Sequence, residues 1–294
     1  MTLNATCVGE LVRSLADSGA RGRVRRIFRN SAYLESRGGL ALLLRGDLRS
    51  PMTVNLAPGP EFTNILSIKQ AFELGHDTLD LGELEIRLDG APTFSSSLMD
   101  GRPTNPIAEA DVVRGATALK LLYSASQPSL ELVSGRAFGE FASSVLEPFA
   151  HGKMDRVYFF RNYVGLIGNG SGFTPAGDDL VAGFTAAFNH YAKGTDTVPI
   201  SLPLTELKKR TVNESASLLD YAQRGYVDEG LERLILSGLG NKPVQFRAEL
   251  SELASRGHTS GLDMSLGVLS LVAVLGDYIR HGTALESSLA AIGD

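Results

Sequence analysis

The stretch GLIGNGSGFTPAGDDLVAGF, residues 165–184, holds six glycines, a Thr-Pro pair and two adjacent aspartates. A packed helix avoids so many glycines, because each glycine in a helix interior costs about 0.5–1 kcal/mol relative to alanine. A surface linker has no need of the Asp-Asp pair. The stretch therefore indicates a loop that turns into a helix and has a role beyond connecting two elements.

A helix start is expected at Thr174 and Pro175. A threonine hydroxyl accepts hydrogen bonds from the free N–H groups of a first turn, and proline is tolerated at the first helical position. The helix then runs through Asp178 and Asp179, and a spacing of four places Asp179 and Gly183 on one face that is lined by small residues. Another helix or a ligand is expected to approach this face closely.

A second stretch, GHTSGLDMSLG at residues 257–267, repeats the pattern of the first if one residue is dropped, and the two copies start 85 residues apart (257 − 172). Both read Gly-x-Thr, then Gly-x-Asp, then Gly four residues after the Asp. Ser260 and Asp263 have the spacing of a capping box, and Asp263 shares a helix face with Gly267. We therefore expect matched helix starts, at Thr174 and Ser260, that converge on one pocket.

Nucleotide-binding motifs do not fit the loop. Gly172 and Gly177 have P-loop spacing, but Asp178 and Asp179 follow where that motif requires Lys and then Ser or Thr. Backbone N–H groups at a helix N-terminus still favour an anion, which we expect between Gly170 and Gly177, while carboxylates hold a cation or accept from an amide. The plainer interpretation of each aspartate is a favourable contact with the helix dipole, worth about 0.3–1 kcal/mol.

These motifs supply the candidate site. The expected catalytic residues are Asp178, Asp179 and Asp263. Asp178 and Asp179 are also the expected ligands if a metal such as magnesium is bound. The expected substrate-binding residues are Asn169, Gly170, Ser171, Gly172, Thr174, Gly177, His258, Thr259, Ser260 and Gly261.

Other polar residues are weaker candidates. Arg161 and Asn162 precede the loop, where they either reach a carboxylate or phosphate or lie on the surface. A helical pattern near Glu214 holds Thr211, Asn213 and Ser215. A solvated helix face is favoured for this group over the polar wall of a pocket.

Composition excludes several classes of protein. The 294 residues are 43% hydrophobic and 21% charged with a net charge of -5, which is typical of a soluble globular protein and lacks the basic excess of a nucleic-acid binder. Cys7 is the single cysteine, so no intrachain disulfide is expected and a reducing cytoplasm fits. The N-terminus lacks a signal-peptide pattern. The apolar run at residues 264–279 is shorter than the roughly 20 residues that cross a bilayer, so we expect a buried helix and no membrane partner.

The pattern of the chain changes near residue 100. After a short opening helix that contains Cys7, residues 1–100 hold short apolar or alternating runs separated by turn formers, with a hairpin turn at 36–40. Turn formers and two prolines at 95–106 mark a boundary. We predict an α+β protein, with a β-rich domain (1–100) followed by a mainly helical domain (101–294) that carries the glycine-rich loop. The segments with helical spacing include residues 107–125, 135–150, 204–225 and 245–257.

The glycine motifs resemble the AllH-type family, which includes a subunit of oxamate carbamoyltransferase from anaerobic allantoin breakdown and many uncharacterised bacterial proteins. Residues 165–183 and 257–267 carry the resemblance, with looser similarity at 211–225. The resemblance implies carbamoyl transfer between oxalurate and phosphate, giving oxamate and carbamoyl phosphate, beside other subunits. Preorganised N–H donors suit the oxyanion that forms when the carbamoyl carbon is attacked. No general base is identified in the chain, which favours a shared site or a supporting subunit.

Three hypotheses stay open. The leading one is a subunit of a carbamoyltransferase-like enzyme that acts on a small carboxylated amide. The second is a magnesium-dependent enzyme that binds a phosphorylated ligand or nucleotide, with Asp178 and Asp179 as hard oxygen ligands. The third is a non-catalytic partner whose glycine loop closes against another subunit.

Overall fold

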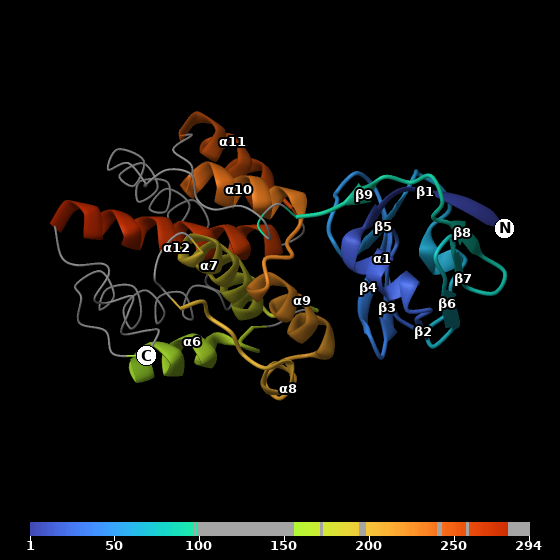
Figure 1. The fold of residues 1–294 in the computed structure, drawn as a ribbon, viewed down its shortest axis with the longest axis horizontal. Coiled ribbons are helices and arrows are strands. Elements are labelled where there is room, and N and C mark those ends of the chain that lie inside the picture. Colours follow the sequence, from blue (N-terminus) through green and yellow to red (C-terminus); the bar gives the residue numbers. More distant parts are fainter. Residues whose placement is uncertain are drawn as a thin grey trace. The chain divides into compact units, whose positions relative to one another are not determined.

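A computed structural model describes residues 1–96, 98, 156–170, 173–193, 198–239, 243–256 and 259–281. The chain splits into two compact units, one formed by Met1–Ser96 with Tyr226–Glu229 and the other by the remainder. The first is rich in strands and the described part of the second is helical, which confirms the α+β class (Figure 1). The expected boundary between residues 100 and 101 lies outside the described residues.

The β-rich unit is a closed, barrel-like sheet. Its strands follow the order β5-β4-β3-β2-β6-β7-β8-β1, and an antiparallel pairing of β1 with β5 joins the two ends. The short β9 adds to β1 in parallel. The elements are β1 Thr2–Gly9, α1 Glu10–Asp17, β2 Arg21–Ile27, β3 Ser31–Ser36, β4 Gly39–Arg45, β5 Thr53–Leu56, the 3-10 helix η1 Phe62–Asn64, β6 Ala71–Leu74, β7 Thr78–Asp80, β8 Glu85–Arg87 and β9 Thr93–Phe94.

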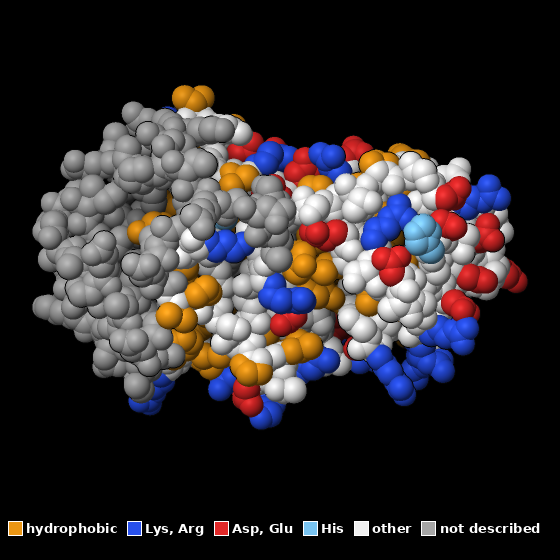
Figure 2. Space-filling view, viewed as in Figure 1, with side chains coloured by type: hydrophobic (Ala, Val, Ile, Leu, Met, Phe, Trp, Pro, Cys, Tyr) orange, Lys and Arg blue, Asp and Glu red, His pale blue; other side chains and the backbone are white. Residues whose placement is uncertain are grey.

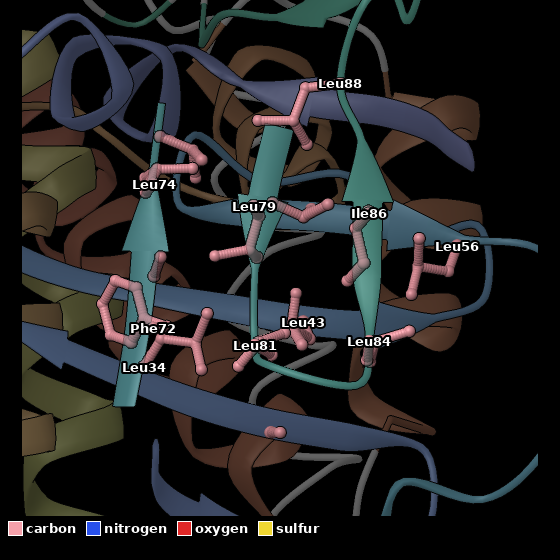
Figure 3. Packing of buried hydrophobic residues seen from close by; sticks show 14 of the residues in the cluster. Leu34, Leu43, Leu56, Phe72, Leu74, Leu79, Leu81, Leu84, Ile86 and Leu88 are labelled. Atoms are coloured by element: carbon pink, nitrogen blue, oxygen red, sulfur yellow. The ribbon is translucent and has the colours of Figure 1, made fainter. Parts of the chain in front are cut away.

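Alternation along the strands fills the inside of this sheet. In β6, for example, Phe72 and Leu74 are buried while the residues between and before them are exposed. Leu43, Leu79 and Ile86 come from other strands into the same cluster and are fully buried (Figure 3). Each such side chain stabilises the fold by about 1.5–3 kcal/mol relative to an exposed position, so the cluster gives this unit a core of its own.

The opening segment differs from the expectation. Residues 2–9 form strand β1, and the helix α1 begins only at Glu10, so the prediction that Cys7 lies in an opening helix is wrong. The alternating polar and apolar residues of TLNATCV suit a strand with one buried face, and Cys7 is buried at its end. The expected hairpin turn is confirmed, because Ser36 pairs with Gly39 across β3 and β4.

Charged side chains of both signs are interspersed on the described surface (Figure 2). Exposed pairs join some of them, such as Arg21 with Glu73 at 2.6 Å and Arg29 with Glu61 at 2.7 Å. Exposed pairs of this kind contribute about 0–1 kcal/mol each, so burial of apolar side chains dominates the stability of this unit.

The second unit is built around one buried helix, α7. Every residue of α7 except Tyr191 is buried, and α12 packs along it (Figure 1). Phe184 and Phe188 stack within α7 with ring centroids 6.0 Å apart. The helices are α6 Arg156–Leu166, α7 Ala176–Ala192, α8 Leu204–Leu207, α9 Asn213–Gln223, α10 Glu229–Leu239, α11 Pro243–Ala254 and α12 Ser260–His281.

The apolar run that begins at Met264 lies in α12, and its described side chains after Met264, as far as Val272, are all buried. None of the described helices has the length and apolar character needed to cross a membrane. The helices expected at residues 107–125 and 135–150 fall outside the described residues.

Candidate functional site

Helix α7 begins at Ala176, two residues after Thr174. The expected cap is wrong in detail, because Pro175 occupies the N-cap position and no side chain caps the helix. The Thr174 hydroxyl instead donates to Oδ2 of Asp179 at 3.0 Å. This threonine therefore binds a carboxylate of the first turn and not a backbone N–H group.

The two helix starts lie together. Thr174 Oγ1 and Ser260 Oγ are 3.2 Å apart, although 86 residues separate them in the chain. Asp179 lies close enough to Ser260, Thr174 and Asp263 for each of them to influence its pKa. The structure thus brings the expected residues of both motifs into one cluster, which we call the Asp179 cluster (Thr174, Asp179, Ser260 and Asp263). The pocket expected there stays a prediction.

Close contact between α7 and α12 fixes this cluster. A Cβ atom at Gly183 would overlap the carbonyl oxygen of Met264, and one at Gly267 would overlap that of Leu180. Gly267 stands 84 residues after Gly183, and Met264 stands 84 residues after Leu180 (267 − 183 and 264 − 180). Each helix therefore places its glycine against the equivalent carbonyl oxygen of the other helix. The helices therefore meet backbone to backbone, which is why both motifs need a glycine four residues after the aspartate.

A second pair of glycines makes a similar close contact six residues earlier in each helix (183 − 177 and 267 − 261). A Cβ at Gly177 would overlap the carbonyl oxygen of Leu166, and one at Gly261 would overlap that of Leu253. Each motif therefore packs the start of its helix on the end of the preceding helix, α6 or α11. The two sequence motifs are alike because each lies in a helical hairpin of similar packing.

The carboxyl group of Asp179 has a strongly raised pKa. Its side chain is buried, and this burial is the main reason that its pKa rises from 3.8 to about 7. The hydroxyl groups of Ser260 and Thr174 lower the pKa, while the charges of Asp263 and Asp178 raise it further. Near neutral pH this group can both hold and release a proton, which is the property required of a general acid or base.

Asp178 has a different environment from Asp179. Its Oδ1 accepts from the N–H of Gly168 at 2.7 Å, and its Oδ2 accepts from the hydroxyl of Thr211. Burial raises the pKa of Asp178, and these two hydrogen bonds lower it. Asp178 therefore connects α7 to the turn after α6 and to the residues before α9.

The backbone at the start of α7 is largely engaged within the protein. The N–H of Gly177 donates to the carbonyl of Asn169 at 2.9 Å, and those of Asp178 and Asp179 donate to the carbonyl of Pro175 at 2.9 and 3.3 Å. These three groups are among the donors that the sequence suggested for an anion. Anion binding near Gly170–Gly177 therefore stays a prediction and does not rest on them.

Metal binding gains no support from the described part of the chain. Among those residues, no group of three or more His, Cys, Asp or Glu side chains is placed to hold a metal ion. The carboxylate of Asp178, expected as a ligand, is used by Gly168 and Thr211. Magnesium with Asp178 and Asp179 as ligands stays a prediction.

The segment before and within α9 differs from the sequence-based expectation. Glu214 and Ser215 are 4% and 1% exposed, and Thr211 binds Asp178, so the expectation of a solvated face is wrong. Helix α9 packs against α7, which buries this polar group. A run of small and polar residues at a helix start was the only local signal, and it does not identify a partner 33 residues away.

The remaining candidates are placed as follows. Asn169 is exposed and contributes its carbonyl to the turn, Gly170 packs on the backbone of Ala176, and Thr259 accepts from the N–H of Asp263 at 2.9 Å. Arg161 is exposed. The expected site residues Ser171, Gly172 and His258 lie outside the described residues.

One comparison with known proteins found a match, and the match covers this region. Residues 166–272 match the family model described as oxamate carbamoyltransferase subunit AllH, which confirms the resemblance carried by the two glycine motifs. This match contains all four residues of the Asp179 cluster, with the whole of α7 and α11 and the first part of α12. Searches of curated proteins and of solved structures found no match.

Proposed function

We propose that this chain, whose residues 166–272 match the AllH family, is a subunit of a carbamoyltransferase-like enzyme that acts on a small carboxylated amide of the oxalurate or oxamate type with phosphate. The observation that carries the proposal is the Asp179 cluster inside the matched region. It offers one acid–base group and two hydroxyl groups from two helix starts.

Carbamoyl transfer from oxalurate to phosphate requires a proton at the amide nitrogen that leaves. When a phosphate oxygen attacks the carbamoyl carbon of oxalurate, the bond from that carbon to the amide nitrogen breaks, and the leaving oxamate nitrogen takes up a proton. Asp179, with a pKa of about 7, is suited to supply this proton near neutral pH and to recover it in the reverse reaction. This assigns an acid–base role that the sequence alone left open.

The same group is expected to favour an amide over a second carboxylate in the ligand. When ionised, the carboxyl group of Asp179 accepts a hydrogen bond from an amide N–H, and a second carboxylate in the ligand would be repelled by it and by Asp263. Oxamate, which has one carboxylate and one amide, is therefore expected to bind better than oxalate, which has two carboxylates. This pair of compounds differs mainly at the group that the Asp179 cluster recognises.

Isothermal calorimetry at pH 8 with oxamate and oxalate tests the proposal, on the chain alone and with the subunits that co-purify from its native source. Tighter binding of oxamate, lost in Asp179→Asn and kept in Gly165→Ala, supports it. Gly165 is a matched control because it lies in the neighbouring helix α6 and nothing lies within 4 Å of an added Cβ. Equal binding of oxamate by the wild type and Asp179→Asn would remove Asp179 from the site.

Carbamoyl phosphate formation by the co-purified assembly decides between a catalytic and a supporting subunit. If the assembly turns over oxalurate and the Asp179→Asn assembly does so equally well, the chain is a non-catalytic partner. If the variant assembly is complete but inactive, this chain contributes the acid–base group.

A further inference from the structure

We infer that Asp178 is a positioning residue and not a group that contacts substrate, and that it holds the turn after α6 and the start of α9 in place against α7. The inference concerns the site of the proposed function and rests on that function only for its effect on ligand binding. The direct evidence is that both carboxylate oxygens of Asp178 accept hydrogen bonds from the protein, one from Gly168 and one from Thr211.

The position of Asp178 agrees with this role. Its side chain is 2% exposed, and the groups that it binds come from the two segments that flank the start of α7. Gly168 has a φ of 82°, which favours glycine, and a Cβ there would overlap the carbonyl oxygen of Arg210, the residue before Thr211. The turn and the segment before α9 therefore touch each other as well as Asp178.

The second helical hairpin provides an internal comparison. Asp179 and Asp263 stand at matching positions 84 residues apart (263 − 179), and so do Gly177 and Gly261 (261 − 177). The residue that matches Asp178 is Leu262, which has no carboxylate. The aspartate shared by both motifs is therefore Asp179, and Asp178 serves a need of the first hairpin alone.

The contacts of Asp178 suggest how the site depends on it. The turn that it holds is linked to the helix start, because the carbonyl of Asn169 accepts from the N–H of Gly177 and Gly170 packs against Ala176. Thr174 lies between Gly170 and Gly177 in the chain, and Asp179 lies two residues after Gly177. Release of Gly168 is expected to loosen the helix start that places the Asp179 cluster.

Substitutions of Asp178 separate positioning from chemistry. In Asp178→Asn the amide oxygen can accept from Gly168 and the amide NH2 can donate to Thr211, so both connections remain without a charge. In Asp178→Ala both are lost. A substrate-binding carboxylate or a metal ligand would tolerate neither change.

Hydrogen exchange at the Gly168 amide, followed by NMR or mass spectrometry, gives a readout that does not depend on the ligand. We expect at least tenfold faster exchange in Asp178→Ala, and exchange within threefold of the wild type in Asp178→Asn. Unchanged exchange in the alanine variant would overturn the inference. If Asp178→Ala does not fold, Thr211→Val replaces it, with Thr211→Ser as its control, because the serine keeps the hydroxyl that binds Asp178.

Oxamate calorimetry on the same variants then tests the link to function. We expect affinity within threefold of the wild type for Asp178→Asn and a loss of at least tenfold for Asp178→Ala. Loss of affinity in both, with normal Gly168 exchange in Asp178→Asn, would show that the charge acts on the ligand and would overturn the inference. If the wild type binds no oxamate, the proposed function fails, while Gly168 exchange still decides the role of Asp178.

Discussion

Replacement of Asp179 by asparagine is expected to stabilise the helical unit at high pH and to change its stability little at low pH. The reason is that the folded protein raises the pKa of this buried carboxyl group from 3.8 to about 7. The folded state therefore binds the proton more tightly than the unfolded state, and stability falls as the pH rises from about 4 to about 7. Asparagine removes this ionisation but keeps a polar group that can bond to Thr174.

The size of the effect follows from the shift in pKa. A shift of about three units corresponds to roughly 4 kcal/mol of unfavourable free energy once the group is ionised in the folded state. About 3 kcal/mol of this is expected to appear between pH 5 and pH 8. The gap in unfolding free energy between Asp179→Asn and the wild type should therefore widen by about 2–3 kcal/mol over this interval.

Urea denaturation followed by ellipticity at 222 nm measures this gap, because the helices of the second unit dominate that signal. Glu206→Gln serves as a control in the same unit, since Glu206 is a partly exposed group whose pKa is lowered by its bond to Lys209. This control should gain no stability at pH 8. A gap for Asp179→Asn that is the same at pH 5 and pH 8 would refute the assignment of a raised pKa to Asp179.

Three further predictions follow from the packing and the charges. Gly183→Ala should destabilise the protein by about 1–3 kcal/mol in urea denaturation, because the new Cβ overlaps the α12 backbone. The control Gly165→Ala should stabilise the protein by about 0.5–1 kcal/mol. Similar values for the two variants would contradict the close contact between the helices. Asp263→Asn should lower the pKa of Asp179, measured by carboxyl 13C NMR, because one of the charges that raise it is removed; an unchanged pKa would place Asp263 further away. Leu43→Ala should cost the β-rich unit about 2–5 kcal/mol in urea denaturation, and a cost below 1 kcal/mol would contradict its full burial.

The sequence predicted the fold class and the sharpest local features. Alternating runs indicated strands β2 to β5 and the turn between Ser36 and Gly39, because period-two patterns and turn residues act over a few positions. The expected opening helix begins only at Glu10, and the alternating residues before it form strand β1. The closure of the sheet through β1 and β5 has no local signal, since the partners are some 50 residues apart.

The sequence predicts the candidate site only in part, because it shows the repeated motif but not the partners of each aspartate. The repeated motif indicated that Thr174 and Ser260 belong together, and the structure places them in contact. The separate roles of Asp178 and Asp179 were not visible, because adjacent aspartates look alike until their partners are known. Thr211, the partner of Asp178, lies in a segment that resembles any polar helix start.

The contact between Gly183 and Gly267 also bears on how the site tolerates change. Where two helices are separated by large side chains, a substitution alters their spacing and moves everything attached to them. Here main chain rests on main chain, so the distance between the first turns of α7 and α12 depends on peptide geometry at two glycines. Substitutions at exposed positions of the other helices leave this main-chain contact between α7 and α12 in place. The distance between the carboxyl groups of Asp179 and Asp263 therefore does not depend on substitutions elsewhere in the helical unit.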